Sequence, residues 1–333
     1  MAKSNVMIKI LSVTLVCLSL FTAGCSGENP QDEKKPEGSH SVPETQKVAE
    51  QAEETKMPEG PDRTEQESRE ELPSIVEMDW SEYFGELNGA AVFYSPQENT
   101  YQVYSPELAT TRRSPCSTFK IISSLIALET GAITPEQSTR TWSGEIFWNE
   151  DWNRDIDFET AFRTSCVWYF REVIDALGKD TVQAYLDELQ YGNCDISDWE
   201  GRLNTNNSNP ALTGFWIESS LKISPKEQVE VMERIFGENS EYSKQTKSQL
   251  KQVMLVSHET PYLVYGKTGM GKAQGVVVDC WFTGFAENEN ENLYFCVYLG
   301  ETEGENPSST QAKEIALDII GDIWANSPQK EPI

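Results

Sequence analysis

The sequence predicts an α+β fold, in which an antiparallel β-sheet is flanked by helices and a helical region is inserted between its early and late strands. Three observations predict this arrangement. Two strand-like runs flank a turn near residue 97, helical patterns begin at residues 117, 158 and 224, and three further strand-like runs follow residue 262. A last helical pattern follows these runs, and the terminal helices are expected to pack on one side of the sheet.

The early strands form a predicted hairpin. Gly89–Ser95 and Thr100–Ser105 are rich in aromatic and β-branched residues, and the segment Pro96–Asn99 between them is typical of a turn. The late strands are predicted at residues 262–266, 276–285 and 293–299, with the polar loop 287–292 joining the last two as a hairpin.

The first helix of the inserted region is predicted over Ser117–Thr130, where apolar residues recur with helical spacing and Gly131 follows as a terminator. Another helix begins after Ser224, because Ser224, Pro225 and Glu227 match a capping box with proline at the first helical position. The same patterns assign a mainly helical stretch at 158–177, a loop dense in Asn and Gly at 191–214, and a final helix at 310–324.

The N-terminus has the features of an export signal. Lys3 and Lys9 precede the apolar run Ile10–Leu20, which is shorter than the ~20 residues of a membrane-spanning helix. Small residues then lead directly to Cys25, as in a bacterial lipobox, so we predict a lipoprotein signal peptide over residues 1–24 and lipidation of Cys25. An ordinary signal peptide with an incidental cysteine is the alternative. Lipidation would hold the exported protein on the cell membrane, facing the extracytoplasmic side.

An acidic segment follows the proposed lipid site. Residues 25–74 contain almost no large apolar side chains and are predicted to form a disordered tether, which leaves residues 75–333 as the catalytic domain. The formal net charge of the chain is −27, and much of the excess lies in this segment. A chain of this charge repels phosphate backbones, so a nucleic-acid partner is not expected.

The seven cysteines do not suggest a metal site. Cys17 lies in the predicted signal and Cys25 is the proposed lipid site, and no CxxC pair or Cys/His spacing typical of zinc occurs among the others. We expect buried free thiols at the five remaining positions, Cys116, Cys166, Cys194, Cys280 and Cys296.

Histidine is nearly absent, which restricts the possible catalytic bases. His40 lies in the tether, and His258 is the single histidine of the folded part. A nucleophilic serine therefore needs a different base, and Lys120 is the candidate. Ser117 and Lys120 are three residues apart at the start of a helix, so they share a face, and free N–H groups and the helix dipole lie near Ser117. Desolvation of Lys120 among apolar neighbours would lower its pKa and make the amine reactive.

Three further motifs follow in order: Ser165-Cys-Val167, Tyr191-Gly-Asn193 and Lys267-Thr-Gly269. Each is weak alone, and Tyr191-Gly-Asn193 also fits a tight turn. Together with Ser117-Thr-Phe-Lys120 they resemble the penicillin-recognising serine enzymes, and specifically the class D, oxacillinase-type β-lactamases. The segment Trp216-Ile-Glu218 and the run Asp279–Phe285 are also similar to that family, and the resemblance covers roughly residues 80–325.

The resemblance implies a role for each matched residue. Ser117 would attack the lactam carbonyl, and Lys120 would carry a carbamate (N6-carboxylysine), formed from carbon dioxide or bicarbonate, that acts as general base. Ser165 would relay a proton to the departing nitrogen. Val167 would keep the environment of Lys120 apolar, and the indole N–H of Trp216 would donate a hydrogen bond to the carbamate. Lys267 and Thr268 of the Lys267-Thr268-Gly269 motif would bind the substrate carboxylate. The N–H groups of Ser117 and Met270 would form the oxyanion hole.

One departure from the family pattern concerns the substrate carboxylate. Many members have an Arg beyond the Lys-Thr-Gly motif that pairs with this group, but here no Arg follows Arg234. Lys272 or Lys313 could take its place, without the bidentate fork of a guanidinium.

The predicted function is hydrolysis of the β-lactam ring of penicillin-type antibiotics through a serine acyl-enzyme, which confers β-lactam resistance. The main alternative is a β-lactam sensor domain that is acylated without turnover; such domains normally have Asn in place of Val167 and follow several transmembrane helices. Penicillin-binding proteins usually have S-x-N in place of Ser165-x-Val167. The Glu-based motif of a class A β-lactamase is not found after Ser165, and a purely structural lipoprotein would require four accidental motifs.

Overall fold

A computed structural model of the chain describes residues 72–203, 208–257 and 262–326. The chain divides into two units, residues 1–67 and 68–333, and all the described residues belong to the second. The predicted signal peptide, the proposed lipid site Cys25, nearly all of the tether and both histidines lie outside the described residues. In the described part of the chain, no helix is both long and apolar enough to cross a membrane.

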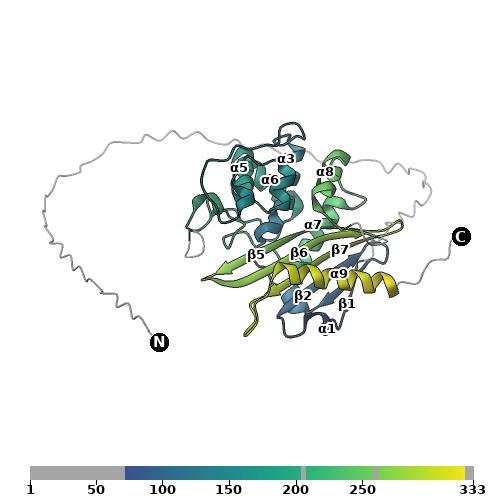
Figure 1. Cartoon of the computed structure of the whole chain (residues 1–333). Helices are drawn as coiled ribbons and strands as arrows, with labels where there is room; N and C mark the ends of the chain where they lie inside the picture. Colours follow the sequence, from purple (N-terminus) through teal and green to yellow (C-terminus); the bar gives the residue numbers. More distant parts are fainter. Residues whose placement is uncertain (1–71, 204–207, 258–261, 327–333) are drawn as a thin grey trace, which may run out of the picture. The chain divides into compact units, whose positions relative to one another are not determined.

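The centre of the fold is a seven-stranded sheet with the order β1-β3-β2-β7-β6-β5-β4 (Figure 1). Its strands are β1 (Ser74–Glu77), β2 (Gly89–Ser95), β3 (Thr100–Tyr104), β4 (Leu255–Ser257), β5 (Leu263–Ala273), β6 (Val276–Glu287) and β7 (Asn292–Gly300). The predicted early hairpin is β2–β3, and the predicted late hairpin is β6–β7. The α+β fold is therefore confirmed.

The prediction of a wholly antiparallel sheet needs one correction. Strand β1 begins at Ser74, the last residue assigned to the tether, and it pairs with β3 in parallel. Because β2 is already bonded to β3 on one side and β7 on the other, the outer edge of β3 is where β1 can add. The sheet is mixed, with antiparallel pairing between all the other neighbouring strands.

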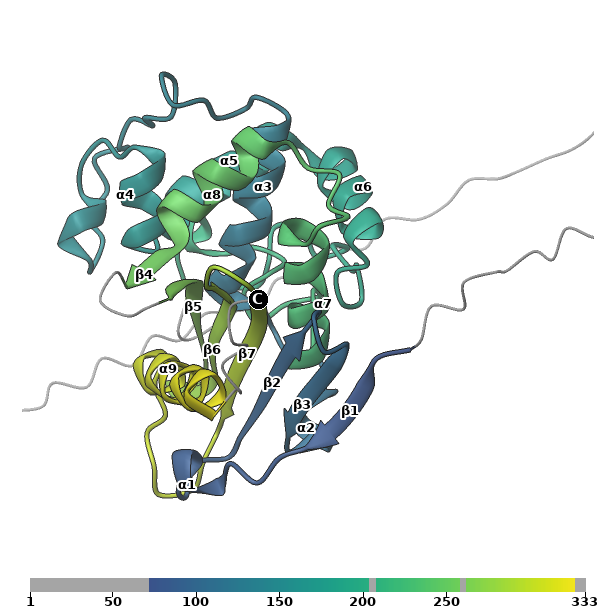
Figure 2. The ribbon, with the colours of Figure 1, turned by 90° about the vertical axis from the view of Figure 1, so that its right-hand side faces the viewer.

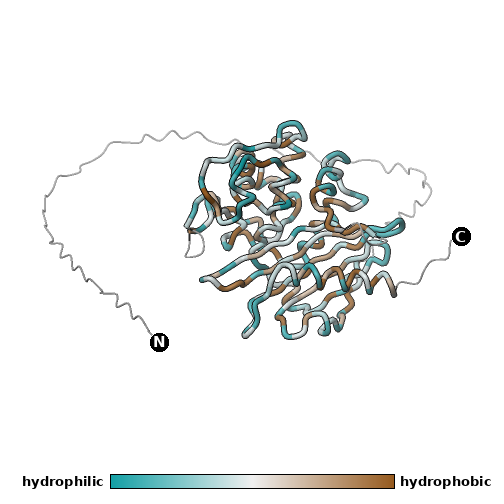
Figure 3. Tube along the Cα trace, viewed as in Figure 1, coloured by the Kyte–Doolittle hydropathy of each residue, from teal (hydrophilic) through white to brown (hydrophobic). Residues whose placement is uncertain are grey.

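One face of the sheet is covered by the two terminal helices, as predicted (Figure 2). They are α1 (Ser81–Phe84) and α9 (Ser309–Asn326). Side chains from both helices, including Phe84, Ile315 and Ile319, share a buried cluster with Phe93 and Phe295 of the sheet. Figure 3 shows how hydrophobic stretches follow the strands beneath these helices.

The inserted helical region forms a second and larger core on the other face (Figures 1 and 2). Its α-helices are α2 (Pro106–Ala109), α3 (Lys120–Glu129), α4 (Phe158–Arg163), α5 (Val167–Leu177), α6 (Lys179–Leu189), α7 (Pro225–Phe236) and α8 (Lys244–Met254). Three short 3₁₀ turns are η1 (Cys116–Phe119), η2 (Glu150–Trp152) and η3 (Pro210–Leu212). The predicted helix over Ser117–Thr130 is η1 followed by α3, and the stretch 158–177 is two helices, α4 and α5.

The predicted capping box at the start of α7 is present. The Ser224 hydroxyl accepts the N–H of Glu227, and the Glu227 carboxylate accepts the N–H of Ser224 at 2.9 Å. These bonds satisfy two N–H groups that the first turn of a helix leaves free. The next residue, Gln228, donates to the Thr118 hydroxyl at 2.9 Å, so α7 is fixed against η1.

The five cysteines of the folded part are free thiols, as expected, and four of them are buried, whereas Cys194 is only partly buried. Cys280 and Cys296 lie on the adjacent strands β6 and β7, but they are not opposed. Cys280 pairs with Leu299 and packs in the core beneath α9, whereas Cys296 pairs with Thr283 and packs in the helical core.

Candidate active site

The centre of the site is the pair Ser117 and Lys120, at the junction of η1 and α3. The side-chain nitrogen of Lys120, Nζ, donates a hydrogen bond to the Ser117 hydroxyl oxygen over 2.9 Å. Helix α3 is buried along almost its whole length, so its first residue, Lys120, is carried into the core and is only 1% exposed. The sequence prediction that these two side chains share a face and meet is confirmed.

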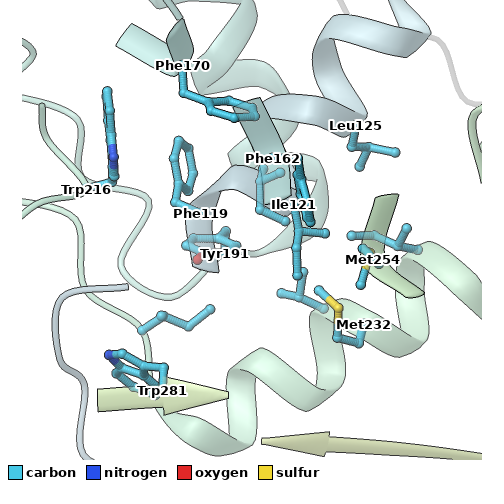
Figure 4. Close-up of a cluster of buried hydrophobic side chains, with 14 of the residues drawn as sticks. Phe119, Ile121, Leu125, Phe162, Phe170, Tyr191, Trp216, Met232, Met254 and Trp281 are labelled. Carbon is cyan, nitrogen blue, oxygen red and sulfur yellow. The ribbon is translucent and has the colours of Figure 1, made fainter. Parts of the chain in front are cut away.

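The surroundings of Lys120 are apolar and aromatic. Its Nζ lies 5.5 Å from the ring centre of Phe170, and the adjacent ring of Phe119 stacks on Trp216 at 5.8 Å. Figure 4 shows these rings gathered around the start of α3. Because burial removes water from the charged amine, the pKa of Lys120 falls from 10.5 to about 8. Below pH 8 the neutral amine is therefore a minor but accessible form.

A second serine–lysine pair lies beside the first. Lys267 Nζ donates to the Ser165 hydroxyl and to the Thr268 carbonyl, each over 3.1 Å. Desolvation by burial, together with the positive charge of nearby Lys120, lowers the pKa of Lys267 from 10.5 to about 7. The site thus holds two serines, each within hydrogen-bond distance of a buried lysine.

Ser165 and Val167 are placed by the break between α4 and α5. Ser165 has a positive φ of 57°, which turns the chain, and the next N–H, of Cys166, bonds the Ala161 carbonyl at 2.8 Å. Val167 is the first residue of α5 and packs against the helical core. Phe170, which the sequence reasoning missed, is one turn further along α5, and this i, i+3 spacing from Val167 is the signal that could have identified it.

The Lys267-Thr268-Gly269 motif is corrected in one respect: it lies within β5 rather than at the end of a strand. Strand β4 pairs with β5 only at Val264 and Tyr265, so the strand beyond these residues presents an edge to η1. A Cβ at Gly269 would lie 3.0 Å from the Pro115 carbonyl oxygen. The two chain segments therefore approach so closely that a Cβ at this position would require the neighbouring backbone to shift by a few tenths of an ångström.

Met270 and Trp216 lie at the site, but their predicted roles stay predictions. Met270 follows Gly269 on β5, and its side chain is 47% exposed. Trp216 is buried, and its backbone carbonyl accepts the N–H of Cys116 at 2.9 Å, immediately before the nucleophile. The oxyanion hole assigned to the N–H groups of Ser117 and Met270 would thus form between η1 and β5.

Tyr191-Gly192-Asn193 forms a tight turn. Gly192 has a positive φ of 57°, and a Cβ there would lie 2.0 Å from the Lys222 carbonyl oxygen. The Asn193 side chain accepts the N–H of Lys222 and donates to the Ser220 carbonyl, each at 2.9 Å. The turn thereby anchors the segment that carries Trp216, and we assign it no chemical step.

The two candidate partners of a substrate carboxylate are placed differently. Lys272 lies on β5 itself, five residues after Lys267, and is exposed. Lys313 lies on α9, which covers the face of the sheet opposite the helical region. Thr268, on the same strand as Lys267, remains the third predicted contact of this group.

Burying Lys120 has a predictable effect on stability. Its folded-state pKa of about 8 lies below the ordinary 10.5. Below pH 8 both the folded and the unfolded chain carry the proton, so the whole cost of burying the charge is present. Between pH 8 and 10.5 the unfolded chain binds more protons, and stability rises with pH. We expect Lys120→Met to raise the free energy of unfolding by about 2–3 kcal/mol near pH 7, and by less as the pH approaches 10.

Urea unfolding of Lys120→Met without added bicarbonate measures this effect. Lys244→Met is a suitable control, since Lys244 is an exposed lysine at the start of α8. Equal or lower stability of Lys120→Met at pH 7, relative to the unsubstituted protein, would contradict the burial of an uncompensated amine.

Comparison with known proteins places this site in a family. Residues 88–321 match the family described as penicillin binding protein transpeptidase domain. Regulatory protein BlaR1 of Staphylococcus aureus is 30% identical over 246 residues, which cover 74% of this chain and 39% of that protein. The probable β-lactamase YbxI of Bacillus subtilis is 30% identical over 252 residues, which cover 74% of this chain and 85% of that protein.

A solved structure supports the same assignment. The crystal structure of a class D β-lactamase from Bacillus subtilis superposes with a TM-score of 0.63 at 28% identity, covering 75% of this chain and 98% of that one. The chain spans well under half the length of the BlaR1 protein that it matches. The chain belongs to the penicillin-binding protein transpeptidase domain family, in which it is similar to class D β-lactamases as well as to BlaR1 sensor domains.

Proposed function

We propose that this protein is a class D serine β-lactamase that hydrolyses the β-lactam ring of penicillin-type antibiotics and confers resistance to them. The observation that carries the proposal is the buried Lys120 amine, whose pKa is lowered to about 8 and which lies 2.9 Å from the Ser117 hydroxyl. A base at this position can accept the proton of the serine when it attacks, and later that of a water molecule.

The proposed acylation step uses both serine–lysine pairs. Ser117 Oγ forms a bond to the lactam carbonyl carbon while its proton passes to the base at Lys120. The carbon–nitrogen bond of the ring then breaks, and the nitrogen takes a proton through the Ser165 hydroxyl, which Lys267 contacts at 3.1 Å. The product is an ester between Ser117 and the opened antibiotic.

Deacylation requires the same base to activate water. Water attacks the ester carbonyl, the base at Lys120 takes its proton, and the Ser117 oxygen leaves as the hydroxyl. In the proposal Lys120 carries a carbamate, which supplies a carboxylate base. Two features support it: Lys120 is only 1% exposed, and the ring of Phe170 lies 5.5 Å from its Nζ. Carbon dioxide reacts with the neutral amine, which a lowered pKa provides.

The second candidate function is a β-lactam sensor that is acylated once and does not turn over. The similarity to BlaR1 over 74% of this chain favours it. The presence of Val167 at the start of α5, rather than the Asn expected of sensors, favours the enzyme, because an apolar side chain leaves the Lys120 amine unsolvated.

Steady-state cleavage of a chromogenic cephalosporin, measured with and without added bicarbonate, distinguishes the two functions. We expect many turnovers per active site and a higher rate with bicarbonate, since a base at Lys120 must act in both half-reactions. Lys120→Ala is expected to lose deacylation. A single burst equal to the protein concentration, with no further product, would refute the enzyme and establish the sensor.

We also propose that the protein is exported and attached to the membrane through a lipid on Cys25, outside the described residues. The apolar run Ile10–Leu20 and the small residues before Cys25 support this. In a bacterial host, the full-length protein is expected in the membrane fraction and Cys25→Ser in the soluble exported fraction. Membrane association of Cys25→Ser equal to that of the unsubstituted protein would contradict lipidation at this residue.

A further inference from the structure

One short segment, Trp216–Glu218, contacts both walls of the active site. On the first wall, the Trp216 carbonyl accepts the N–H of Cys116 at 2.9 Å, next to Ser117 in η1. On the second wall, the Glu218 carboxylate accepts the backbone N–H of Lys272, two residues beyond Met270 on β5. The segment therefore links η1 to the edge strand β5.

The walls also touch directly, at two glycines. A Cβ at Gly269 would meet the Pro115 carbonyl at 3.0 Å, and a Cβ at Gly271 would meet the Cys116 thiol at 2.9 Å. The absence of a Cβ at these two positions lets the walls come this close. Close approach at the two glycines does not keep η1 and β5 from moving apart. An attractive contact between the two walls is needed to hold them together, and the Glu218 carboxylate supplies one by accepting the Lys272 N–H.

Two residues that take part in this link, Cys116 on η1 and Glu218 on the linking segment, have an uncommon backbone conformation. Cys116 has a φ of 51° and Glu218 a φ of 50°, and the left-handed region costs a residue with a Cβ about 1–2 kcal/mol. The pairing of β5 with β6 shifts register between Gly271 and Lys272. The ladder is thus irregular at the residue whose N–H Glu218 accepts, and the carboxylate helps to fix the position of that residue.

We propose that Glu218 is a positioning residue that sets the distance between η1 and β5, and thereby aligns the N–H groups of Ser117 and Met270 on the developing oxyanion. The proposal rests on the acyl transfer of the proposed function, but not on turnover, because an enzyme and a sensor both pass through this oxyanion during acylation. Glu218 itself touches no reacting atom in this account.

Acylation of full-length protein by two penicillins tests the proposal. One is an ordinary penicillin, and the other carries sulfur in place of the lactam carbonyl oxygen, which hydrogen-bonds weakly in an oxyanion hole. Glu218→Ala removes the acceptor of the Lys272 N–H, whereas Glu218→Gln keeps a carbonyl oxygen there. Glu129→Ala is the matched control, since the Glu129 carboxylate accepts the N–H of Ser243 at 3.0 Å at the far end of α3.

We expect Glu218→Ala to slow acylation by the ordinary penicillin by about 10- to 100-fold, and to slow acylation by the sulfur analogue much less. In Glu218→Ala, the ratio of the acylation rate with the ordinary penicillin to the rate with the sulfur analogue should therefore fall sharply. Glu218→Gln should restore this rate ratio. Glu129→Ala should lower the melting temperature but leave the rate ratio unchanged.

Two results would overturn the positioning role. One is an unchanged acylation rate in Glu218→Ala. The other is an equal loss of rate with both penicillins, which would indicate general destabilisation of the fold. Failure of the unsubstituted protein to be acylated by the ordinary penicillin would instead refute the proposed acyl transfer.

Discussion

The burial of the Lys120 amine beside Ser117 is the constraint on which the rest of the site depends. A charged lysine in an apolar core is destabilising, and the hydrogen bond from Lys120 to Ser117 offsets this cost only in part. The ring of Phe170 lies 5.5 Å from Nζ, and the neighbouring stacked rings of Phe119 and Trp216 complete an apolar enclosure. The same enclosure brings the pKa of the amine to about 8, which is the range in which it can act as a base.

A second consequence follows from the edge of the sheet. An unpaired strand edge usually exposes N–H and C=O groups and favours aggregation. Here η1 covers the edge of β5 and packs against it through Gly269 and Gly271. The edge is therefore shielded from pairing with another chain. Its N–H groups that are not hydrogen-bonded to a neighbouring strand remain accessible to substrate. The nucleophile follows directly on Cys116, which has a positive φ and whose thiol lies next to Gly271 of β5.

The parts of this architecture that sequence predicted best are local. Ser117 and Lys120 are three residues apart on one helix, so their contact follows from helical geometry. The capping box at Ser224 and the hairpin of β2 and β3 are equally local, and all three are confirmed. Family resemblance added the order of the motifs, and with it the expectation that Ser165 and Lys267 belong to the same site.

The parts that sequence did not predict depend on tertiary contacts. Strand β1 is exposed along its whole length, and its parallel pairing is determined by which edge is open. Helices α6 and α8 were not predicted because they are mostly polar, although their three and four buried residues recur at helical spacing. The extent of β5 beyond Gly266 comes from its pairing with β6. The bond from the Lys272 N–H to Glu218 joins residues 54 positions apart, so no local pattern could predict it.

The central proposal is that the Lys120 amine, whose pKa its surroundings lower to about 8, captures carbon dioxide in its neutral form. The most direct measurement is a carbon-13 NMR spectrum of the protein with labelled bicarbonate at pH 8. The account predicts one carbamate signal per chain, which disappears in Lys120→Met and diminishes reversibly at pH 6, where the amine with a pKa of about 8 is protonated. Absence of this signal at saturating bicarbonate, in protein that a penicillin still acylates, would contradict it.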